Sequence, residues 1–524
     1  MNKFLSIITI STLAFTACTS THSSSESTAE QRSCDSIDSI KAIKMTPLPD
    51  TVYESASVVK FTIDRRDSTS GKIDDYTDYY ATAPGALTFR NGLYRQADFG
   101  GRVSKTPTEV VVDWTFVTAM DNRSTSVGTW GGGTGWTGQP LYVKWPDEYF
   151  NKFKTVSGTT ADFGQEEIIV GSLAGRVYFI NYQTGKASRE PISVGNPIKG
   201  TVSLDPTLNG NLYVGHGVPA ERPFGAVLID LNTNKVADVF GEDPKAGRRW
   251  GAYDSSTLRY GQFVFRPGEN GTIYKLNAVP GKAPIHTALR YTINGMAPGI
   301  ESSMCIYRNY GYTADNAGNI LAFNLDTMKP VWRYNLGDDI DASLVLEEED
   351  GIPYIYVGCE VDKQGTGTAN MVKLNAINGE EVWLAKVPAR RANVNEKHFD
   401  GGFYGTVLLG TGNCSDLIFA NCVLNEGGQN GVFMALKKST GDILYKTRLK
   451  YYSWSSPVGF LNDNDELTIL TGDCTGNIYL IEPRSGEIKF VNRIGSNFES
   501  SPVVIGNTVV IGTRGDKIFR LTVK

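Results

Sequence analysis

A recurring acidic position is the first feature of this sequence that could carry chemistry. Short stretches of the type "SSPV" recur along the chain, and the residue before each is often a carboxylate. The repeat places these eight residues at the position: Thr137, Lys199, Asp254, Glu301, Asp341, Asp400, Trp454 and Glu499. Carboxylates that converge on one place repel one another unless a cation, basic side chains or water compensates. Because calcium takes about six to eight oxygen ligands, the pattern predicts a cation or polar-ligand site, with calcium as the candidate cofactor. The alternative is that these acids accept hydrogen bonds from neighbouring backbone.

Basic and aromatic residues beside two of these acids are candidates to complete a pocket. They are Arg248, Arg249 and Trp250 before Asp254, and Lys397 and His398 before Asp400. Arginine pairs with carboxylates through a planar fork. Part of the acidic set is therefore expected to be neutralised within the protein.

A glycine- and tryptophan-rich stretch, "TWGGGTGWTGQP" (129–140), is a second candidate for ligand contact. Its glycines would allow close approach of the backbone, while Trp130 and Trp136 offer flat faces for a sugar or a quinone. The alternative is a set of tight turns with both rings packed between neighbouring elements. The stretch does not match the phosphate-binding pattern G-x-x-x-x-G-K-[ST].

The cysteines and histidines do not indicate a structural metal site. The chain has seven Cys without a C-x-x-C pair, and four His, which argues against structural zinc. Cys414 and Cys422 flank the loop-sized insert "SDLIFAN". They either form a local disulfide or remain two small buried thiols.

The acidic positions belong to an internal repeat. Each unit reads as an "SSPV"-type strand, a "YVG"-type strand, an "xYxLN" strand and a last strand ending in an aromatic residue such as Trp332 or Trp383. Alternating apolar residues between Gly, Asn and Asp turns are typical of antiparallel strands. The central apolar residue of the third strand recurs every 40 to 62 residues, at Ile180, Ile229, Leu276, Phe323, Leu374, Leu436, Ile481 and Leu521.

Four strands in roughly 45 residues make one blade of a β-propeller. The last unit stops at Lys524 after its third strand, and "EVVVDWTFVT" (109–118), with Trp114, can supply the missing outer strand. A ring closed in this way leaves no exposed sheet edge. We therefore predict an all-β fold, an eight-bladed propeller over 109–524 with seven blades as the alternative count. No helix of useful length is expected, and 47–108 should pack on the propeller or help to close it. The eight repeat positions should ring one mouth of the axial channel.

The phrases "ILAFNLDTMKPVW" and "MVKLNAINGEEVW" resemble the pyrroloquinoline-quinone-type propeller repeat, in which a tryptophan-like residue docks each blade on the next. The resemblance covers about 110–524. Families with this repeat include quinone-dependent alcohol dehydrogenases, the lipoprotein scaffold of outer-membrane protein assembly, and surface lipoproteins of unknown role. "WGGGTGWTGQPL" is similar to one such uncharacterised branch. The known dehydrogenase site includes a vicinal disulfide, and no two cysteines here are adjacent. Pyrroloquinoline quinone is therefore not the cofactor that we expect.

The first residues indicate export. Residues 1–17 have one lysine, an apolar stretch too short to span a bilayer and small residues before Cys18, which is typical of a signal peptide. Cys18 fits the lipobox of a bacterial lipoprotein, so we expect it to be lipidated; a plain cleaved signal is the alternative. The Ser/Thr-rich residues 18–46 read as a disordered tether, and the membrane would be reached through the lipid alone.

The charge balance of the chain bears on the class of partner that it could bind. The chain has 51 basic and 56 acidic side chains and a net charge of −5, which argues against a nucleic-acid partner. We predict a bacterial cell-envelope lipoprotein of the outer membrane. It would act as a non-enzymatic binding or scaffold propeller for an envelope protein or a glycan. The alternatives are a lyase-like enzyme acting on polysaccharides and a quinone-dependent dehydrogenase, either of which would use the channel mouth.

Overall fold

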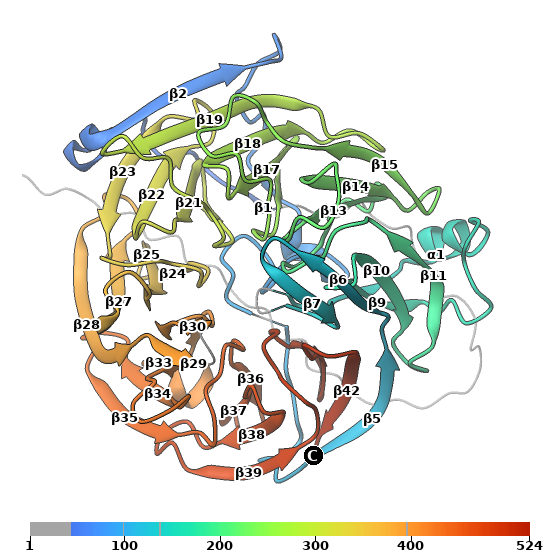
Figure 1. Ribbon diagram of the computed structural model, residues 1–524, viewed down its shortest axis with the longest axis vertical. Coiled ribbons are helices and arrows are strands. Elements are labelled where there is room, and N and C mark those ends of the chain that lie inside the picture. Colours follow the sequence, from blue (N-terminus) through green and yellow to red (C-terminus); the bar gives the residue numbers. More distant parts are fainter. Residues whose placement is uncertain (1–42, 98, 136–137, 395–396) are drawn as a thin grey trace, which may run out of the picture. The chain divides into compact units, whose positions relative to one another are not determined.

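The structure, a computed structural model, describes residues 43–524 except 98, 136, 137, 395 and 396. The predicted signal peptide, Cys18, the tether up to residue 42, and Trp136 with Thr137 lie outside the described residues. Eight antiparallel sheets follow one another around a central axis (Figure 1). The predicted eight-bladed, all-β propeller is therefore confirmed.

The blades follow the order of the chain, and in each the first of the four strands lies on the axis side of the other three. Blades 1 to 4 consist of β8 (Leu141–Lys144), β9 (Glu166–Ser172), β10 (Arg176–Asn181) and β11 (Ala187–Ser193); β12 (Ser203–Leu204), β13 (Asn211–Gly215), β14 (Ala226–Asp230) and β15 (Lys235–Phe240); β16 (Leu258–Tyr260), β17 (Phe263–Gly268), β18 (Thr272–Asn277) and β19 (Ile285–Ile293); and β20 (Cys305–Tyr307), β21 (Tyr310–Ala314), β22 (Asn319–Asn324) and β23 (Pro330–Asn335).

Blades 5 to 8 complete the ring. They consist of β24 (Val345–Glu349), β25 (Ile352–Gly358), β27 (Thr366–Asn375) and β28 (Glu381–Arg390); β32 (Leu408–Leu409), β33 (Leu417–Val423), β34 (Gly431–Lys437) and β35 (Ile443–Arg448); β36 (Val458–Leu461), β37 (Leu467–Gly472), β38 (Asn477–Ile481) and β39 (Ile488–Arg493); and β40 (Val503–Ile505), β41 (Thr508–Gly512), β42 (Lys517–Val523) and β5 (Val110–Val117). Extra strands extend blade 1, blade 3 and blade 6: β4 (Gly85–Ala86), β2 (Val59–Arg65), and β26 (Glu360–Val361) with β31 (Gly401–Gly402).

The ring closes through strands from opposite ends of the propeller sequence. β5 pairs antiparallel with β42, as the missing outer strand of the last unit predicted. Trp114 of β5 then donates a hydrogen bond of 2.9 Å from its Nε1 to the Tyr182 carbonyl of blade 1. The same contact joins Trp332 to the Ala376 carbonyl (3.0 Å) of the next blade, so the docking role of these tryptophans is confirmed.

The "SSPV" phrase forms a belt of hydrogen bonds around the axis. In blades 3 to 7, a backbone N–H just before the first strand donates to the hydroxyl of the equivalent residue in the next blade. The donor–acceptor distances are 2.9 to 3.3 Å, and the residues are Ser256, Ser303, Ser343, Thr406, Ser456 and Ser501. All six residues are buried. The repeated hydroxyls therefore satisfy backbone donors that the crowded centre shields from water.

One end of the channel is closed by residues 85–97 and 99–103, which we call the plug segment. It crosses the ring behind its centre in Figure 1. Its backbone carbonyls accept hydrogen bonds from the first strands of blades 2, 4, 5 and 7. Two fully buried arginines complete it: Arg90 donates to the Val407 carbonyl at 2.8 Å, and Arg95 to the Ser256 carbonyl at 3.0 Å.

The remaining elements are short. β1 (Ile43–Lys44) pairs with β3 (Thr77–Asp78), and 3-10 turns form at η1 (Glu54–Val58), η2 (Tyr80–Thr82) and η3 (Gly412–Cys414). Within the described residues the only α-helix is α1 (Asp147–Lys154), which the sequence analysis did not predict. Acidic residues in its first turn and lysines in its last turn stabilise the helix, because their charges are opposite to those of the helix dipole at each end. No helix in this part of the chain is long and apolar enough to cross a membrane.

Cys414 and Cys422 are free, so the disulfide alternative is wrong and the alternative of two buried thiols holds. Cys414 packs in the apolar cluster between blades 6 and 7. Cys422 packs in the cluster between blades 5 and 6. The two side chains therefore serve the packing of opposite faces of their blade.

Candidate functional site

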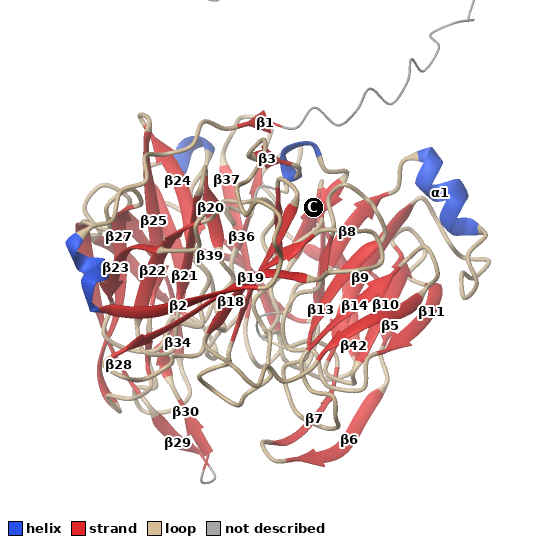
Figure 2. Ribbon diagram, turned by 90° about the horizontal axis from the view of Figure 1, so that it is seen from above, coloured by secondary structure: helices blue, strands red, loops and turns tan. Residues whose placement is uncertain are grey.

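The open mouth of the channel lies at the end opposite the plug segment. Glu499 precedes β40, and the far end of that strand meets the plug segment, where Arg102 N donates to the Gly506 carbonyl at 2.9 Å. Two hairpins project at the end away from β1 and β3 (Figure 2): β6 (Met120–Thr125) with β7 (Gly128–Gly132), and β29 (Ala392–Val394) with β30 (Lys397–Phe399). The repeat positions therefore begin their strands at the face that carries both hairpins.

Three of the predicted repeat positions come together. Lys199, before blade 2, forms ion pairs through its Nζ with an Asp254 carboxylate oxygen and, at 3.3 Å, with Glu301 Oε2. Lys199 and Asp254 are 7% and 1% exposed, whereas Glu301 is half-buried. The ion pairs join blades 2, 3 and 4, because each first strand starts beside that of the next blade.

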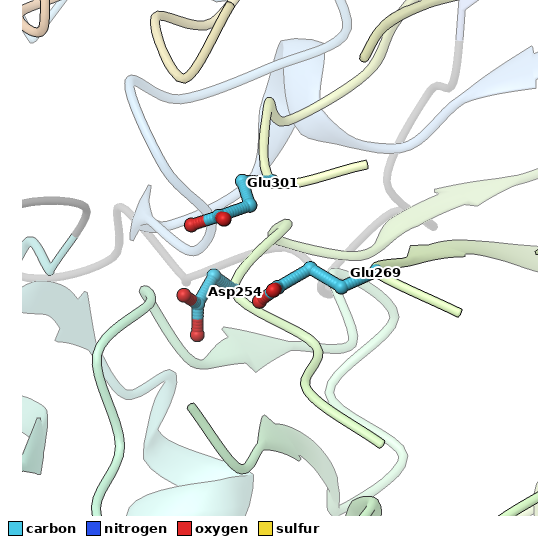
Figure 3. Close-up of side chains that lie close together, drawn as sticks. All are labelled: Asp254, Glu269 and Glu301. Carbon is cyan, nitrogen blue, oxygen red and sulfur yellow. The ribbon is translucent and has the colours of Figure 1, made fainter. Parts of the chain in front are cut away.

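A fourth residue, Glu269, completes the cluster. It follows β17 of blade 3, and one carboxylate oxygen each from Asp254, Glu269 and Glu301 lies within 4.8 Å of the others (Figure 3). Glu269 is 4% exposed, and its Oε2 accepts a hydrogen bond of 2.8 Å from Trp250 Nε1. Its Oε1 is buried without a hydrogen-bond partner in the structure.

Burial changes the ionisation of these acids. Loss of solvation raises the pKa of Asp254 to about 6, although the Lys199 ammonium opposes the shift. The pKa of Glu269 is raised by the same loss of solvation and by the nearby Glu301 charge. A buried carboxylate without enough positive charge nearby takes up a proton or binds a cation.

The acidic set continues towards blades 5 and 6. Burial and the Glu301 charge raise the pKa values of Asp341 and of Asp339, the latter to about 7. Glu360, 3% exposed, has its pKa raised by burial and by Asp341. These acids form a band on one side of the mouth, and Lys199 lies at one end of that band.

The repeat position in blade 6 was wrongly assigned to Asp400. The hydroxyl belt runs through Thr406, so the equivalent of Trp454 before Ser455-Ser456 is Tyr404, four residues later. In "DGGFYGTV" (400–407) glycine follows both Asp400 and Tyr404, so either residue could be taken as the one before the first strand. The glycines after Asp400 form β31 instead. Asp400 remains near the mouth, where Arg391 Nε pairs with its Oδ1 at 2.5 Å.

Aromatic residues adjoin this band and continue around the mouth through blades 6 to 8. Tyr404 and Trp454 stack with ring centroids 4.8 Å apart. Arg514 lies over the ring of Trp130 at 5.0 Å from its centroid, and its Nη1 is 3.5 Å from Glu499 Oε2. Arg514 and Arg391 therefore supply part of the internal neutralisation that the sequence predicted.

Other predicted neighbours lie elsewhere or are not described. Arg249 is exposed, and Trp250, one residue later, contacts the cluster instead. The side chains of Lys397 and His398 lie outside the described part of the chain.

Sequence reasoning missed Glu269, but a signal for it exists. In an antiparallel blade the second strand ends where the first begins, so residues just after the second strand also face the mouth. Glu269 follows β17 directly, and Glu360 comes two residues after the end of β25. The same repeat, applied to second strands, would have predicted both.

A cavity whose lining contains none of the predicted site residues lies elsewhere. It has a volume of about 550 Å³ between the segment before blade 1 and blades 3 and 4, and is lined by Lys72, His286 and Asp326 among others. Asp326 accepts hydrogen bonds from Ile73 N and Tyr76 Oη, and His286 Nε2 contacts the Thr69 carbonyl. Because these groups already hold the segment in place, we assign the cavity to packing.

The fold defines a class: the protein is an eight-bladed β-propeller, similar to the PQQ-like propellers that are named for the pyrroloquinoline-quinone-type repeat. No family model matches the chain. The europium-containing methanol dehydrogenase superposes with a TM-score of 0.57 at 12% identity, over 84% of this chain and 98% of that chain. The quinohemoprotein alcohol dehydrogenase from Comamonas testosteroni gives 0.57 at 11% identity, over 84% and 80%. At these identities the superpositions show the shared fold alone.

Among curated sequences the chain is similar to outer membrane protein assembly factor BamB. It is 23% identical to the Salmonella typhimurium protein over 252 residues, which are 41% of this chain and 61% of that protein. It is 24% identical to the Escherichia coli protein over 253 residues, 41% and 62% of the two chains. The matched region thus spans less than two thirds of the length of these relatives.

Proposed function

We propose that this protein is a non-enzymatic scaffold propeller of the bacterial cell envelope that binds a protein of the outer-membrane assembly machinery. A lipid on Cys18 would anchor it to the outer membrane. The similarity to proteins named as outer membrane protein assembly factors supports this class of function.

The observation that carries the proposal is the pair of hairpins that project beside the open mouth. β6–β7 and β29–β30 are separate two-stranded sheets within the described residues. An isolated two-stranded hairpin is marginally stable in water, and its edges can pair with a strand of another chain. Each hairpin is therefore suited to be completed by a partner.

An apolar surface lies at the first hairpin. Val117, Met120 and Val127 are 60%, 52% and 47% exposed and come from β5, β6 and the turn that joins β6 to β7. Met120 lies at the base of the hairpin and Val127 in the turn at its tip, so exposed apolar side chains occur along the whole hairpin. Exposed apolar side chains on a projecting element suit a protein-interaction site. We expect the partner to cover these three residues.

Capture from native envelopes tests the proposal. The tagged protein, cross-linked in cells and purified in detergent, should retain a component of the machinery that inserts outer-membrane β-barrels. A double variant, Met120→Asp with Val127→Asp, should reduce that capture at least about tenfold, because it places charge in the apolar contact.

Val236→Asp is the matched control, since Val236 is an exposed valine on the outer strand β15 of blade 2 and is remote in sequence from both hairpins. It should leave capture unchanged. Equal capture by the hairpin double variant, or normal amounts of outer-membrane β-barrels in a deletion strain, would count against the scaffold role.

A glycan is the second candidate partner. Tyr404 and Trp454 form a stacked aromatic face near buried acids, which is the arrangement that holds sugar rings. Binding of cell-wall or surface polysaccharide that is lost in Trp454→Ala, while envelope-protein capture persists, would favour this alternative.

A further inference from the structure

We propose that Asp254, Glu269 and Glu301 bind a divalent cation at the mouth of the channel, and that calcium is the ion that suits them. Lys199 is the internal counter-ion of the cation-free state. This inference is independent of the proposed scaffold role, because it depends only on side chains of the mouth.

The spacing of the three carboxylates suits one ion. Calcium–oxygen distances are about 2.3 to 2.6 Å, so two oxygens on opposite sides of one ion are at most about 5.2 Å apart. One oxygen from each of the three acids lies within 4.8 Å of the others. Figure 3 shows the carboxylate of Glu269 extending towards Asp254, with Glu301 beside them.

Glu269 provides an observation beyond the grouping of acids. Its side chain is 4% exposed, and Trp250 fixes one of its two oxygens. The other oxygen, Oε1, is buried and has no hydrogen-bond partner among the described residues. One carboxylate oxygen of Glu269 lies within 4.8 Å of oxygens of Asp254 and Glu301. A buried carboxylate oxygen is costly unless it is paired or bound to a cation.

The charge balance also favours a divalent ion. Asp254, Glu269 and Glu301 face a single ammonium, that of Lys199, and Asp341 adds a further carboxylate nearby. Four carboxylates against one lysine leave an excess of about three negative charges at neutral pH, before proton uptake. A divalent ion removes most of this excess.

The type of the ligands and the loops that carry them favour calcium over zinc, copper and magnesium. All three ligands are carboxylates, which suit hard cations better than zinc or copper. They come from the turn after β17 and from the chain just before blades 3 and 4, rather than from one rigid element. Calcium tolerates such variable geometry, whereas magnesium demands a near-ideal octahedron.

Terbium luminescence tests the site directly, because Tb³⁺ replaces Ca²⁺ and is sensitised by a nearby tryptophan. Trp250 contacts Glu269, so excitation of tryptophan should produce terbium emission that added calcium suppresses. Calorimetric titration of the purified chain, expressed without residues 1–18, should give calcium binding of one ion per chain at about pH 7.5. Trp250→Phe should lose the emission while it keeps calcium binding.

Four variants distinguish binding at this site from a general effect of acidic side chains. Glu269→Gln should weaken calcium binding at least about tenfold, and the half-buried Glu301→Gln should do the same if the first variant does not fold. Lys199→Met should tighten binding at least about threefold, because it removes the competing ammonium. Glu499→Gln, a buried acid of the same ring outside the cluster, should bind calcium as the unmodified protein does.

The outcomes are distinct. Loss of binding in Glu269→Gln or Glu301→Gln, together with a gain in Lys199→Met, supports the site. No calcium binding at about millimolar concentration, or equal affinity in all four charge variants, overturns it. Either result leaves the hairpin experiment unaffected.

Discussion

Lys199 supplies, from within the protein, positive charge that a bound cation would otherwise provide to the carboxylates of the mouth. Its ammonium is 7% exposed and pairs with Asp254 and Glu301 from two neighbouring blades. Burial alone would lower the pKa of this lysine, but the surrounding carboxylates raise it well above its usual value. The lysine therefore stays charged, and the acids beyond its reach carry the excess charge of the mouth.

The ionisation of Asp339 gives a prediction at this scale. Its pKa is raised from 3.8 to about 7, first by burial and then by Glu301. A carboxyl whose pKa is higher in the folded state stabilises the protein at low pH, and this stabilisation is lost as the pH rises from about 4 to about 7. In EDTA, Asp339→Asn should therefore gain stability relative to the unmodified protein between about pH 5 and about pH 7.5. Chemical denaturation at both pH values measures the change.

Asp465→Asn is the control for this prediction. Asp465 is 69% exposed at its side chain and pairs with Arg102 on the surface. Its difference from the unmodified protein should not change over this pH range. A difference for Asp339→Asn that is equally independent of pH would show that Asp339 ionises normally.

At the scale of elements, the turn after the third strand of a blade and the last strand of the preceding blade form one contact. Gly379 has a φ of +76°, and a Cβ there would lie 2.7 Å from ring atoms of Trp332, the docking residue of the preceding blade. Gly441 repeats this arrangement with Trp383. The turn glycine is thus needed both for its left-handed backbone and for the space that the ring fills.

Gly379→Ala should destabilise the protein by about 3 kcal/mol, because strain in the left-handed region adds to displacement of the tryptophan. Gly351→Ala is the matched control: its φ is +81°, but no atom lies within 4 Å of its added Cβ. It should cost only about 1 to 2 kcal/mol. Urea unfolding of both variants measures the difference, and equal losses would mean that the tryptophan contact contributes nothing.

The elements also show what the sequence can and cannot predict. Strands, turns and closure by β5 were predictable because each blade repeats one local pattern of alternation, turn glycine and aromatic residue. Among the described residues, the positions that precede the first strands were mostly predictable for the same reason, with Asp400 as the exception. Tyr404 was missed because β31 adds a glycine pair before the true start of its blade, and Glu269 because the repeat was applied to first strands only.

At the scale of the molecule, the plug segment links blades that are far apart in the sequence. It has no periodic pattern, and the four first strands that donate hydrogen bonds to its carbonyls lie more than a hundred residues further along the chain, so local sequence could not predict it. Arg95 alone donates to the Phe89, Ser256 and Met304 carbonyls. Burial lowers the pKa of this guanidinium to about 10, which still leaves it charged at neutral pH.

Arg95→Met should lower the free energy of unfolding by about 3 kcal/mol or more, since it leaves several buried carbonyls without donors. Arg249→Met, at an exposed arginine, should change it by less than about 0.5 kcal/mol. Calorimetry of the two variants gives the comparison. If both had the same small effect, the plug segment would contribute nothing to holding the ring together.

Because the plug segment closes one end of the channel, the channel is open only at the mouth. An ion or small molecule that reaches the acids of the mouth must leave by the route through which it entered, between the two hairpins. A protein docked on those hairpins would stand over that route and slow its departure. The dissociation rate of an ion bound to the acids of the mouth would then be lower when a partner is docked on the hairpins. Measuring that rate would therefore detect partner binding.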